Sequence, residues 1–290
     1  MSETTSPRAL TSPAVVTRLL NEAGIRPRRS LGQNFLIDAN VLRIIEKAAA
    51  LSPSDTVIEV GAGLGALTQL LVDRCAKVFA LESDRRLLEI LEEELGPAQN
   101  LVLVEADAAR FDFGGLLQGE LPGSVKMVAN LPYGIAATLL IDCLYKYPWI
   151  EEYTVMVQRE IAGRLTSEPG VKDYSAATVK VNCLARAKRV AKVSRNSFYP
   201  PPRVDSSIVH LERLAKPSGL NESFDTIVTA AFSQRRKRLA NSLSSARGLS
   251  IEKKTVTRAL SALGLDPGSR AEQLSPAEFI ELSTMLKERG

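Results

Sequence analysis

Strand-like apolar runs alternate with helical patterns along the middle of the chain, and this alternation limits the possible folds more than any other feature. The strand candidates are Thr56–Val60, Lys77–Leu81, Leu101–Val104, Lys126–Ala129 and Tyr153–Val157. The helical patterns are Ala66–Arg74, Arg85–Glu94, Ala136–Tyr145 and Gln158–Thr166. Strands that alternate with helices in this way predict a parallel, doubly wound α/β sheet.

Further elements are expected on both sides of this region. Two helices precede it, and one helix and two strands follow it: Ser12–Ala23, Asp38–Ala50, Ala176–Ala185, Ala187–Val193 and Ser206–Leu211. The two late strands have no helix between them, because Pro200–Pro202 fits neither a helix nor a central strand. We therefore expect an antiparallel last strand on a mostly parallel sheet.

The C-terminal part is predicted to be helical. Lys216–Gly219 is typical of a linker, and four short helical patterns follow it: Phe224–Phe232, Arg236–Ser245, Ile251–Leu263 and Pro276–Leu286. These patterns predict a disordered tail over residues 1–10, an α/β domain over 11–215 and a small all-helical domain over 216–290.

The composition indicates a globular protein of the cytoplasm. The chain has 290 residues, of which 45% are hydrophobic and 24% charged. No apolar run is long enough to cross a membrane, and the polar N-terminus lacks a signal-peptide pattern. Cys75, Cys143 and Cys183 are too widely spaced for a metal or redox motif. The only histidine, His210, lies in an alternating strand run, where a structural role is expected, so no metal site is predicted.

Charge is unevenly distributed along the chain. The overall net charge is +4, but residues 51–158 are acidic and the segments on both sides of them are basic, above all residues 159–216. A basic flank favours a polyanionic partner such as RNA or DNA. Ordinary solvated surface lysines and arginines are the alternative explanation.

A glycine-rich turn follows the first predicted strand of the sheet. Gly61, Gly63 and Gly65 stand between this strand and the next helix, where glycines permit a tight turn and close approach of a ligand. Glu82 ends the second strand, 21 positions after Gly61, a spacing that suits a carboxylate accepting hydrogen bonds from ribose hydroxyls. This much fits NAD as well as other nucleoside cofactors.

Polar side chains at the next two strand ends narrow the choice of cofactor. Asp107 follows the third strand and can accept a hydrogen bond from the amine of a cofactor adenine. Asn130 ends the fourth strand and opens the sequence Asn130-Leu131-Pro132-Tyr133. An amide oxygen and a free carbonyl can hold both hydrogens of an exocyclic amine, and the tyrosine can stack on the ring that bears it. This suits an adenine whose N6 is modified, although an ordinary strand-to-loop turn would also explain Asn-x-Pro.

With these motifs, the chain resembles the ribosomal RNA adenine N6-dimethyltransferases over almost its whole length. The segments that carry the resemblance are Ser30–Leu36, Glu59–Gly65, Glu82, Asp107, Asn130–Tyr133, Phe198–Ser206 and Phe232–Arg238. The resemblance implies a Rossmann-like class I methyltransferase sheet with a C-terminal helical domain. It also implies transfer of methyl groups from S-adenosylmethionine to two adjacent adenosines in the 3′-terminal hairpin of small-subunit rRNA, each modified twice.

The same resemblance assigns roles to individual residues. Cofactor contacts are expected at Gln33, Asn34, Leu36, Glu59, Gly61, Gly63, Glu82, Asp107 and Asn130. Catalytic roles are expected at Asn130, Leu131, Pro132, Tyr133 and Phe198, with Tyr133 and Phe198 sandwiching the target base. RNA contacts are expected at Arg203, Arg235, Arg236, Lys237 and Arg238. The chain departs from the family pattern at Ser175, where members often carry glycine.

Two alternatives stay open at this point. A resistance-type methyltransferase that acts on large-subunit rRNA would share the cofactor motifs, although the C-terminal helices and the Phe-Tyr-Pro-Pro-Pro run favour the small-subunit type. A non-catalytic ribosome-assembly or transcription factor on the same fold should lose the amine-binding or acidic groups, and this chain retains them. The expected partner is the small ribosomal subunit. We expect neither membrane association nor a bound metal, and we expect the protein to be a monomer.

Overall fold

The computed structural model of the protein describes residues 10–28, 32–117, 123–217, 220 and 222–287. It divides the chain into two compact units. Residues 1–162 and 188–212 form one, here called the sheet unit, and residues 163–187 and 213–290 form the other, here called the helical unit.

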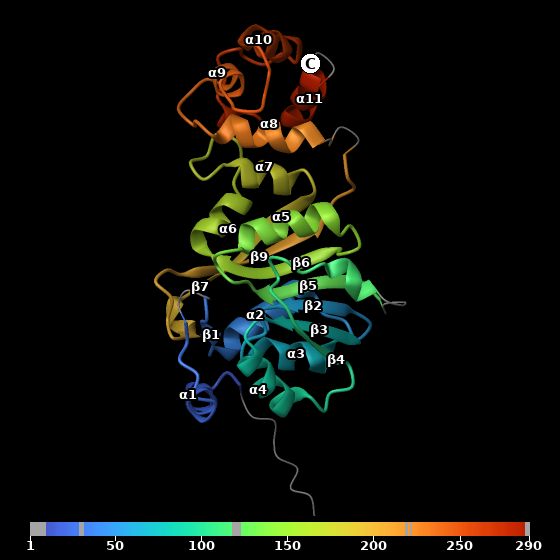
Figure 1. Cartoon of the computed structure of the whole chain (residues 1–290), viewed down its shortest axis with the longest axis vertical. Coiled ribbons are helices and arrows are strands. Elements are labelled where there is room, and N and C mark those ends of the chain that lie inside the picture. Colours follow the sequence, from blue (N-terminus) through green and yellow to red (C-terminus); the bar gives the residue numbers. More distant parts are fainter. Residues whose placement is uncertain (1–9, 29–31, 118–122, 218–219, 221, 288–290) are drawn as a thin grey trace, which may run out of the picture. The chain divides into compact units, whose positions relative to one another are not determined.

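A seven-stranded sheet is the centre of the sheet unit (Figure 1). In order across the sheet, the strands are β4 (Leu101–Glu105), β3 (Lys77–Glu82), β2 (Thr56–Val60), β5 (Val125–Asn130), β6 (Glu152–Gln158), β9 (Ser206–Arg213) and β7 (Ala185–Val193). The strands from β4 to β6 pair in parallel, whereas β9 pairs antiparallel with β6. The structure therefore confirms the mostly parallel sheet with an antiparallel last strand.

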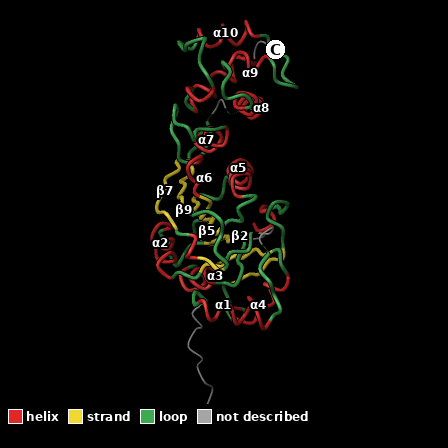
Figure 2. The backbone as a smooth tube through the Cα atoms, turned by 90° about the vertical axis from the view of Figure 1, so that its left-hand side faces the viewer, coloured by secondary structure: helices red, strands yellow, loops and turns green. Residues whose placement is uncertain are grey.

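Helices cover both faces of this sheet. In both views α5 (Ala136–Lys146) lies on one face, and α2 (Ala39–Ala49), α3 (Ala66–Arg74) and α4 (Arg85–Leu95) lie on the other (Figures 1 and 2). Strands β2 and β5 are mostly apolar because side chains on both of their faces are buried, as expected for the centre of a parallel sheet. This packing fixes the C-terminal ends of β2 to β5 along one edge.

A small second sheet was not predicted. Its two strands, β1 (Phe35–Leu36) and β8 (Phe198–Tyr199), pair antiparallel. The backbone N–H of Ile37 also donates to the carbonyl of Ser197 at 2.9 Å. Two-residue strands are too short to produce a periodic pattern, so sequence could not reveal that these distant segments meet.

The N-terminal helix α1 (Pro13–Glu22) forms where it was expected, with proline at its first position. Leu10 is only 2% exposed and packs in an apolar cluster with Val16, Leu20 and Leu64. Burial of this leucine corrects the expectation of a disordered tail at residue 10, while residues 1–9 and residues 30–31 of the N-terminal motif lie outside the described residues.

The helical unit contains α7 (Ala176–Asn182), α8 (Glu222–Phe232), α9 (Leu239–Ser244), α10 (Lys253–Ala262) and α11 (Pro276–Lys287), and α6 (Arg159–Leu165) precedes α7. Helix α7 packs against α8 and α11, and the Tyr174 hydroxyl donates to the carbonyl of Leu274 at 2.8 Å. Residues 163–187 thus belong with the C-terminal helices, which moves part of the chain across the boundary expected at residues 215 and 216. The helix expected from Arg236 begins only at Leu239, so the basic residues before it lie in a turn.

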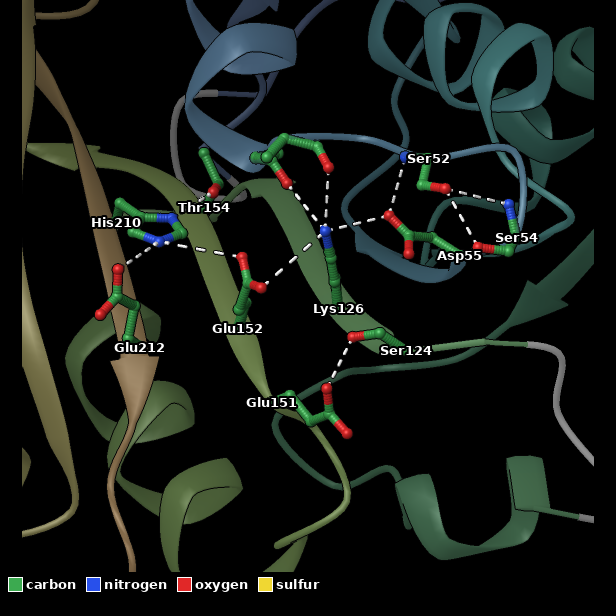
Figure 3. A network of polar contacts seen from close by, with 12 residues as sticks. Ser52, Ser54, Asp55, Ser124, Lys126, Glu151, Glu152, Thr154, His210 and Glu212 are labelled. Carbon is green, nitrogen blue, oxygen red and sulfur yellow. Dashed lines mark hydrogen bonds and ion pairs between the residues drawn. The ribbon is translucent and has the colours of Figure 1, made fainter.

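A buried ionic network lies at the N-terminal ends of β5 and β6, away from the strand ends that carry the cofactor motifs (Figure 3). The ammonium of Lys126 lies 3.0 Å from a carboxylate oxygen of Asp55 and donates to the backbone carbonyls of Ala49 and Ala50. The neighbouring His210 bonds through Nδ1 to Thr154 at 2.9 Å, which matches the structural role expected for it. No helix within the described parts of the chain is both long and apolar enough to span a bilayer.

Candidate active site

One cavity of about 1190 Å³ lies at the C-terminal edge of the parallel strands in the sheet unit. Its walls come from the segments that follow β2, β3, β4 and β5, together with residues 32–35 and 201–203. Ligands of open α/β sheets bind at this edge. The predicted residues that line it are Gln33, Asn34, Gly61, Gly63, Glu82, Asp107, Asn130, Leu131, Pro132, Tyr133 and Arg203.

The glycine-rich turn follows the end of β2 and lines the cavity with Gly61 and Gly63. Gly61 and Gly63 have φ angles of +77° and +61°, a region that disfavours other residues. A Cβ atom on Gly63 would also stand 3.2 Å from the ring of Phe35. Both the backbone conformation and the close packing therefore require glycine at this turn.

Glu82 is held by the backbone around it. Its Oε2 accepts from the N–H of Gly63 at 3.0 Å, and its Oε1 accepts from the N–H groups of Ser83 and Asp84 at 2.7 and 3.0 Å. The residue is 8% exposed and lines the cavity. These three donors fix the carboxylate in place, so that its remaining lone pairs can accept from a diol.

A second polar group beside Glu82 was missed by sequence reasoning. Arg86 donates from Nε and Nη2 to the two carboxylate oxygens of Asp84, at 3.0 and 2.7 Å, and thereby lowers the pKa of this carboxyl. Gln33 donates to Asp84 at 3.0 Å and accepts from the N–H of Arg28 at 2.8 Å. Gln33 therefore braces the cavity wall, and only the N-cap position of Asp84 before α4 could have drawn attention to this group.

Asp107 lies at the open rim. Its side chain is 58% exposed and accepts from the N–H of Ala109 at 3.0 Å. The Nε atom of Arg110 lies 3.9 Å from Oδ2 of Asp107. The Asp107 carboxylate therefore has a defined orientation but is much better solvated than Glu82.

The Asn130–Tyr133 segment forms another wall. The Asn130 amide donates from Nδ2 to the carbonyl of Asn34 at 3.4 Å, so the amide oxygen is the atom that can accept from a substrate. Leu131 donates its N–H to Met156 at 3.1 Å. The Tyr133 hydroxyl bonds to Ser206 at 2.7 Å, and burial raises its pKa. The amide oxygen of Asn130 and the ring of Tyr133 thus belong to one short segment of the cavity wall.

Three of the residues expected to bind the cofactor or to act in catalysis do not line the cavity. Glu59 is 1% exposed, and its Oε2 has no hydrogen-bond partner among the described residues. Burial raises its pKa to about 8, and the neighbouring Glu82 carboxylate adds to the shift. Leu36 and Phe198 are buried in the same apolar core cluster. Because side chains alternate along a strand, Phe198 points inward and Tyr199, 36% exposed, points outward. The Phe198 ring thus lies in the core, and the stacking role expected for it stays a prediction.

The basic residues before α9 differ in their contacts. Arg235 donates from Nη2 to the carbonyls of Lys172 and Tyr174, at 2.7 and 3.0 Å, and lies 3.7 Å from Glu272. Arg235 therefore holds two loops of the helical unit together. Sequence reasoning had expected only a phosphate contact from this residue. The other three members are exposed and lie in the turn: Arg236, Lys237 and Arg238.

The sheet order, the glycine turn and the groups at successive strand ends define a Rossmann-like methyltransferase. The family model "Ribosomal RNA adenine dimethylase" matches residues 24–288, and the chain belongs to this family. It is 42% identical over 289 residues to the "Ribosomal RNA small subunit methyltransferase A" of Moorella thermoacetica, covering 96% of this chain and 99% of that protein. The protein of the same name from Clostridium botulinum (strain Loch Maree / Type A3) is 40% identical over 268 residues, covering 91% and 96%.

Two solved structures show the same architecture. A dimethyladenosine transferase from Plasmodium falciparum has a TM-score of 0.71 and 27% identity, covering 85% of this chain and 95% of that one. The 23S rRNA methyltransferase ErmE has a TM-score of 0.63 and 31% identity, covering 88% and 100%. The resemblance recognised in the sequence is therefore confirmed at the level of the family.

Proposed function

We propose that this protein transfers methyl groups from S-adenosylmethionine to the N6 amines of two adjacent adenosines in the 3′-terminal hairpin of small-subunit rRNA, and methylates each amine twice. The observation that carries the proposal is the Asn130–Tyr133 segment in the wall of a cavity that also exposes Glu82 and Asp107. The names of the relatives from Moorella and Clostridium support the choice of the small subunit.

The cavity fits the cofactor and a target base together. Pockets for a single small molecule enclose roughly 300–1,000 Å³, and this cavity is larger, at about 1190 Å³. The fixed Glu82 carboxylate would accept from the ribose hydroxyls, and Asp107 from the adenine amine. When bound, S-adenosylmethionine supplies a methyl group on a sulfonium, which is a good leaving group.

The chain's own residues would prepare the nucleophile. An adenine amine is a weak nucleophile because its lone pair is delocalised into the ring. The Asn130 amide oxygen and the Leu131 carbonyl would accept its two N–H groups, favour a pyramidal nitrogen and stabilise the positive charge that forms there. Pro132 stiffens the loop and has no N–H that could compete for these acceptors.

The target base has to leave its stack before it can reach this wall. Tyr133 would then stack on one face of the base, with its hydroxyl tethered to Ser206. No general base is needed, since the methylated amine is acidic enough to lose its proton to water. An enzyme with this substrate works in the cytoplasm. We also expect the protein to be a monomer, which light scattering would test.

Methylation of large-subunit rRNA is the competing function, favoured by the similarity to ErmE. Incubation with methyl-labelled cofactor and unmethylated small or large subunits, followed by mapping of the modified bases, separates the two. We expect label on two neighbouring adenosines of the small-subunit hairpin. Label confined to large-subunit rRNA would overturn the proposal in favour of the alternative.

A further inference from the structure

The edge strand of the sheet unit presents a row of exposed cations. Strand β7 ends the order of strands, and Figure 2 shows it beside β9 at the sheet margin. Lys188 and Lys192 lie on its solvent face, while Ala191 and Val193 on the opposite face pack against the apolar core. Arg189 is also exposed. Within the described residues, none of these three cations forms an ion pair, so their charges are available to a partner.

The chain leads directly from this strand to the cavity. After β7 come Arg195 and then Tyr199, both exposed, and residues 201–203 line the cavity. Tyr199 pairs across the small sheet with Phe35, which lines the cavity as well. The N–H of Arg195 donates to Asp205 at 3.1 Å and so fixes the turn between them. Cations, an exposed aromatic ring and the cavity rim therefore follow one another along a braced segment.

We propose that Lys188, Arg189, Lys192, Arg195 and Tyr199, here called the β7 strip, bind the RNA strand beside the target adenosine. The cations would contact phosphates, and the Tyr199 ring would stack on an unpaired base. This inference rests on the proposed function and identifies where the substrate strand runs. It does not use the expected contacts at Arg235–Arg238, which lie in the other unit.

Charge and ring chemistry together favour RNA as the partner. The residues that form most of the cavity wall come from the acidic segment 51–158. An RNA strand that approaches them needs a local positive surface to offset repulsion. Unpaired strands are bound by a positive groove combined with aromatic rings on which bases stack. Lysines on an edge strand can also prevent pairing with other sheets, but that role explains neither Arg195 beyond the strand nor the exposed Tyr199.

Salt dependence tests the cations. The probe is a fluorescent RNA hairpin with two adjacent unpaired adenosines in its loop, bound to the full chain at several salt concentrations. The variant Lys188→Gln/Lys192→Gln/Arg195→Gln should weaken binding and reduce the slope of log K against log salt by about 2, since each phosphate contact contributes roughly 0.7 to 0.9. The control Arg18→Gln/Lys77→Gln/Lys146→Gln removes the same charge elsewhere in the sheet unit and should keep the parental slope.

Stacking is tested separately at Tyr199. Tyr199→Ala should weaken hairpin binding by about 5- to 150-fold, the range that loss of one stacked base produces, and leave the salt slope unchanged. Tyr199→Phe keeps the ring and should bind like the parent. Thermal melting and calorimetric binding of S-adenosylhomocysteine check that each variant is folded.

The outcomes separate this inference from the proposed function. If the parent methylates small subunits while the triple variant keeps the parental slope, the β7 strip does not bind RNA and only the further inference fails. Equal slope changes in the triple variant and its control would also overturn the inference. So would aggregation of the triple variant with unchanged RNA affinity, because the cations would then serve to prevent pairing of the edge strand with other sheets. If the parent binds the hairpin through the strip but methylates no small subunit, the proposed function fails alone.

Discussion

Among single residues, Asn130 should have the largest effect on methyl transfer. Its amide oxygen is oriented by the bond from Nδ2 to Asn34, and it should act mainly on charge that develops in the transition state. Asn130→Ala is expected to lower kcat by about 10²–10³, as loss of one preorganised polar group does, with a smaller effect on cofactor affinity. Single-turnover transfer to small subunits measures this, with the exposed Asn40→Ala as control. Near-normal turnover would refute the role.

Glu82 should be the residue on which cofactor binding depends most. Its two oxygens already accept three backbone N–H groups, so Glu82→Gln would direct an NH₂ group at a donor. We expect calorimetry to show cofactor affinity reduced at least about tenfold, with a loss of stability of about 1–3 kcal/mol from the unsatisfied donor. Asp107→Asn should cost less, because that side chain is 58% exposed. A larger loss at Asp107 than at Glu82 would contradict this order.

Glu59 should make stability fall as pH rises. Its pKa is raised from 4.5 to about 8 by burial, so between these values the folded protein keeps a proton that the unfolded chain has released. The free energy of unfolding then decreases across this window, on the order of a few kcal/mol, and levels off above it. Glu59→Gln cannot ionise and should flatten this decrease in urea unfolding measured from pH 5 to 8. A parallel decrease in the variant would show that another group causes it.

Sequence predicted well which residues at strand ends meet at the cavity. Gly61, Glu82, Asp107 and Asn130 follow four parallel strands, and parallel strands bring such positions to one edge. Sequence did not show that Phe198 is buried, because a one-residue shift along a strand exchanges the buried and the exposed face. The Asp84 group could not be predicted, because it depends on a contact between Gln33 and a residue 51 positions away.

At the scale of elements, segments with a clear periodic pattern formed as predicted, whereas the shortest strands and one helix start did not. Helix α3 has the bounds expected from its pattern, whereas β1 and β8 have only two residues each. The expected helix at Arg236 starts three residues later, at Leu239. Periodicity locates the apolar face of a helix, but caps and turns depend on local hydrogen bonds that it does not encode.

Ser175 illustrates such a cap and gives a prediction for α7. Its hydroxyl accepts from the N–H of Thr178, and the Thr178 hydroxyl accepts from the N–H of Ser175 in return. Ser175→Ala should lower the free energy of unfolding by about 1 kcal/mol, and Ser175→Gly by a few tenths. Urea unfolding compares them, with Ser244→Ala, an exposed position outside a cap, as control. A larger loss for glycine than for alanine would refute the capping role.

For the whole molecule, the two units carry different charge and can be tested independently. Residues 163–187 are basic and pack with the C-terminal helices, so the helical unit includes a segment that lies well before the linker expected at Lys216–Gly219. Linker composition marks where the chain is polar and short of regular structure, but only long-range packing decides to which unit a preceding segment belongs.

The exposed turn of the helical unit gives the last prediction. Arg236→Gln/Lys237→Gln/Arg238→Gln should weaken binding to small subunits and reduce its salt slope by up to about 2 to 3, because these exposed cations are free to meet phosphates. The control Lys253→Gln/Lys254→Gln/Arg258→Gln removes the same charge from α10. Its salt slope should stay closer to the parental slope than that of the turn variant. Arg235→Gln should instead lower the melting temperature, since its guanidinium bonds to the carbonyls of Lys172 and Tyr174. If both triple variants keep the parental slope, the turn is an ordinary solvated surface, and RNA affinity has to come from elsewhere on the protein.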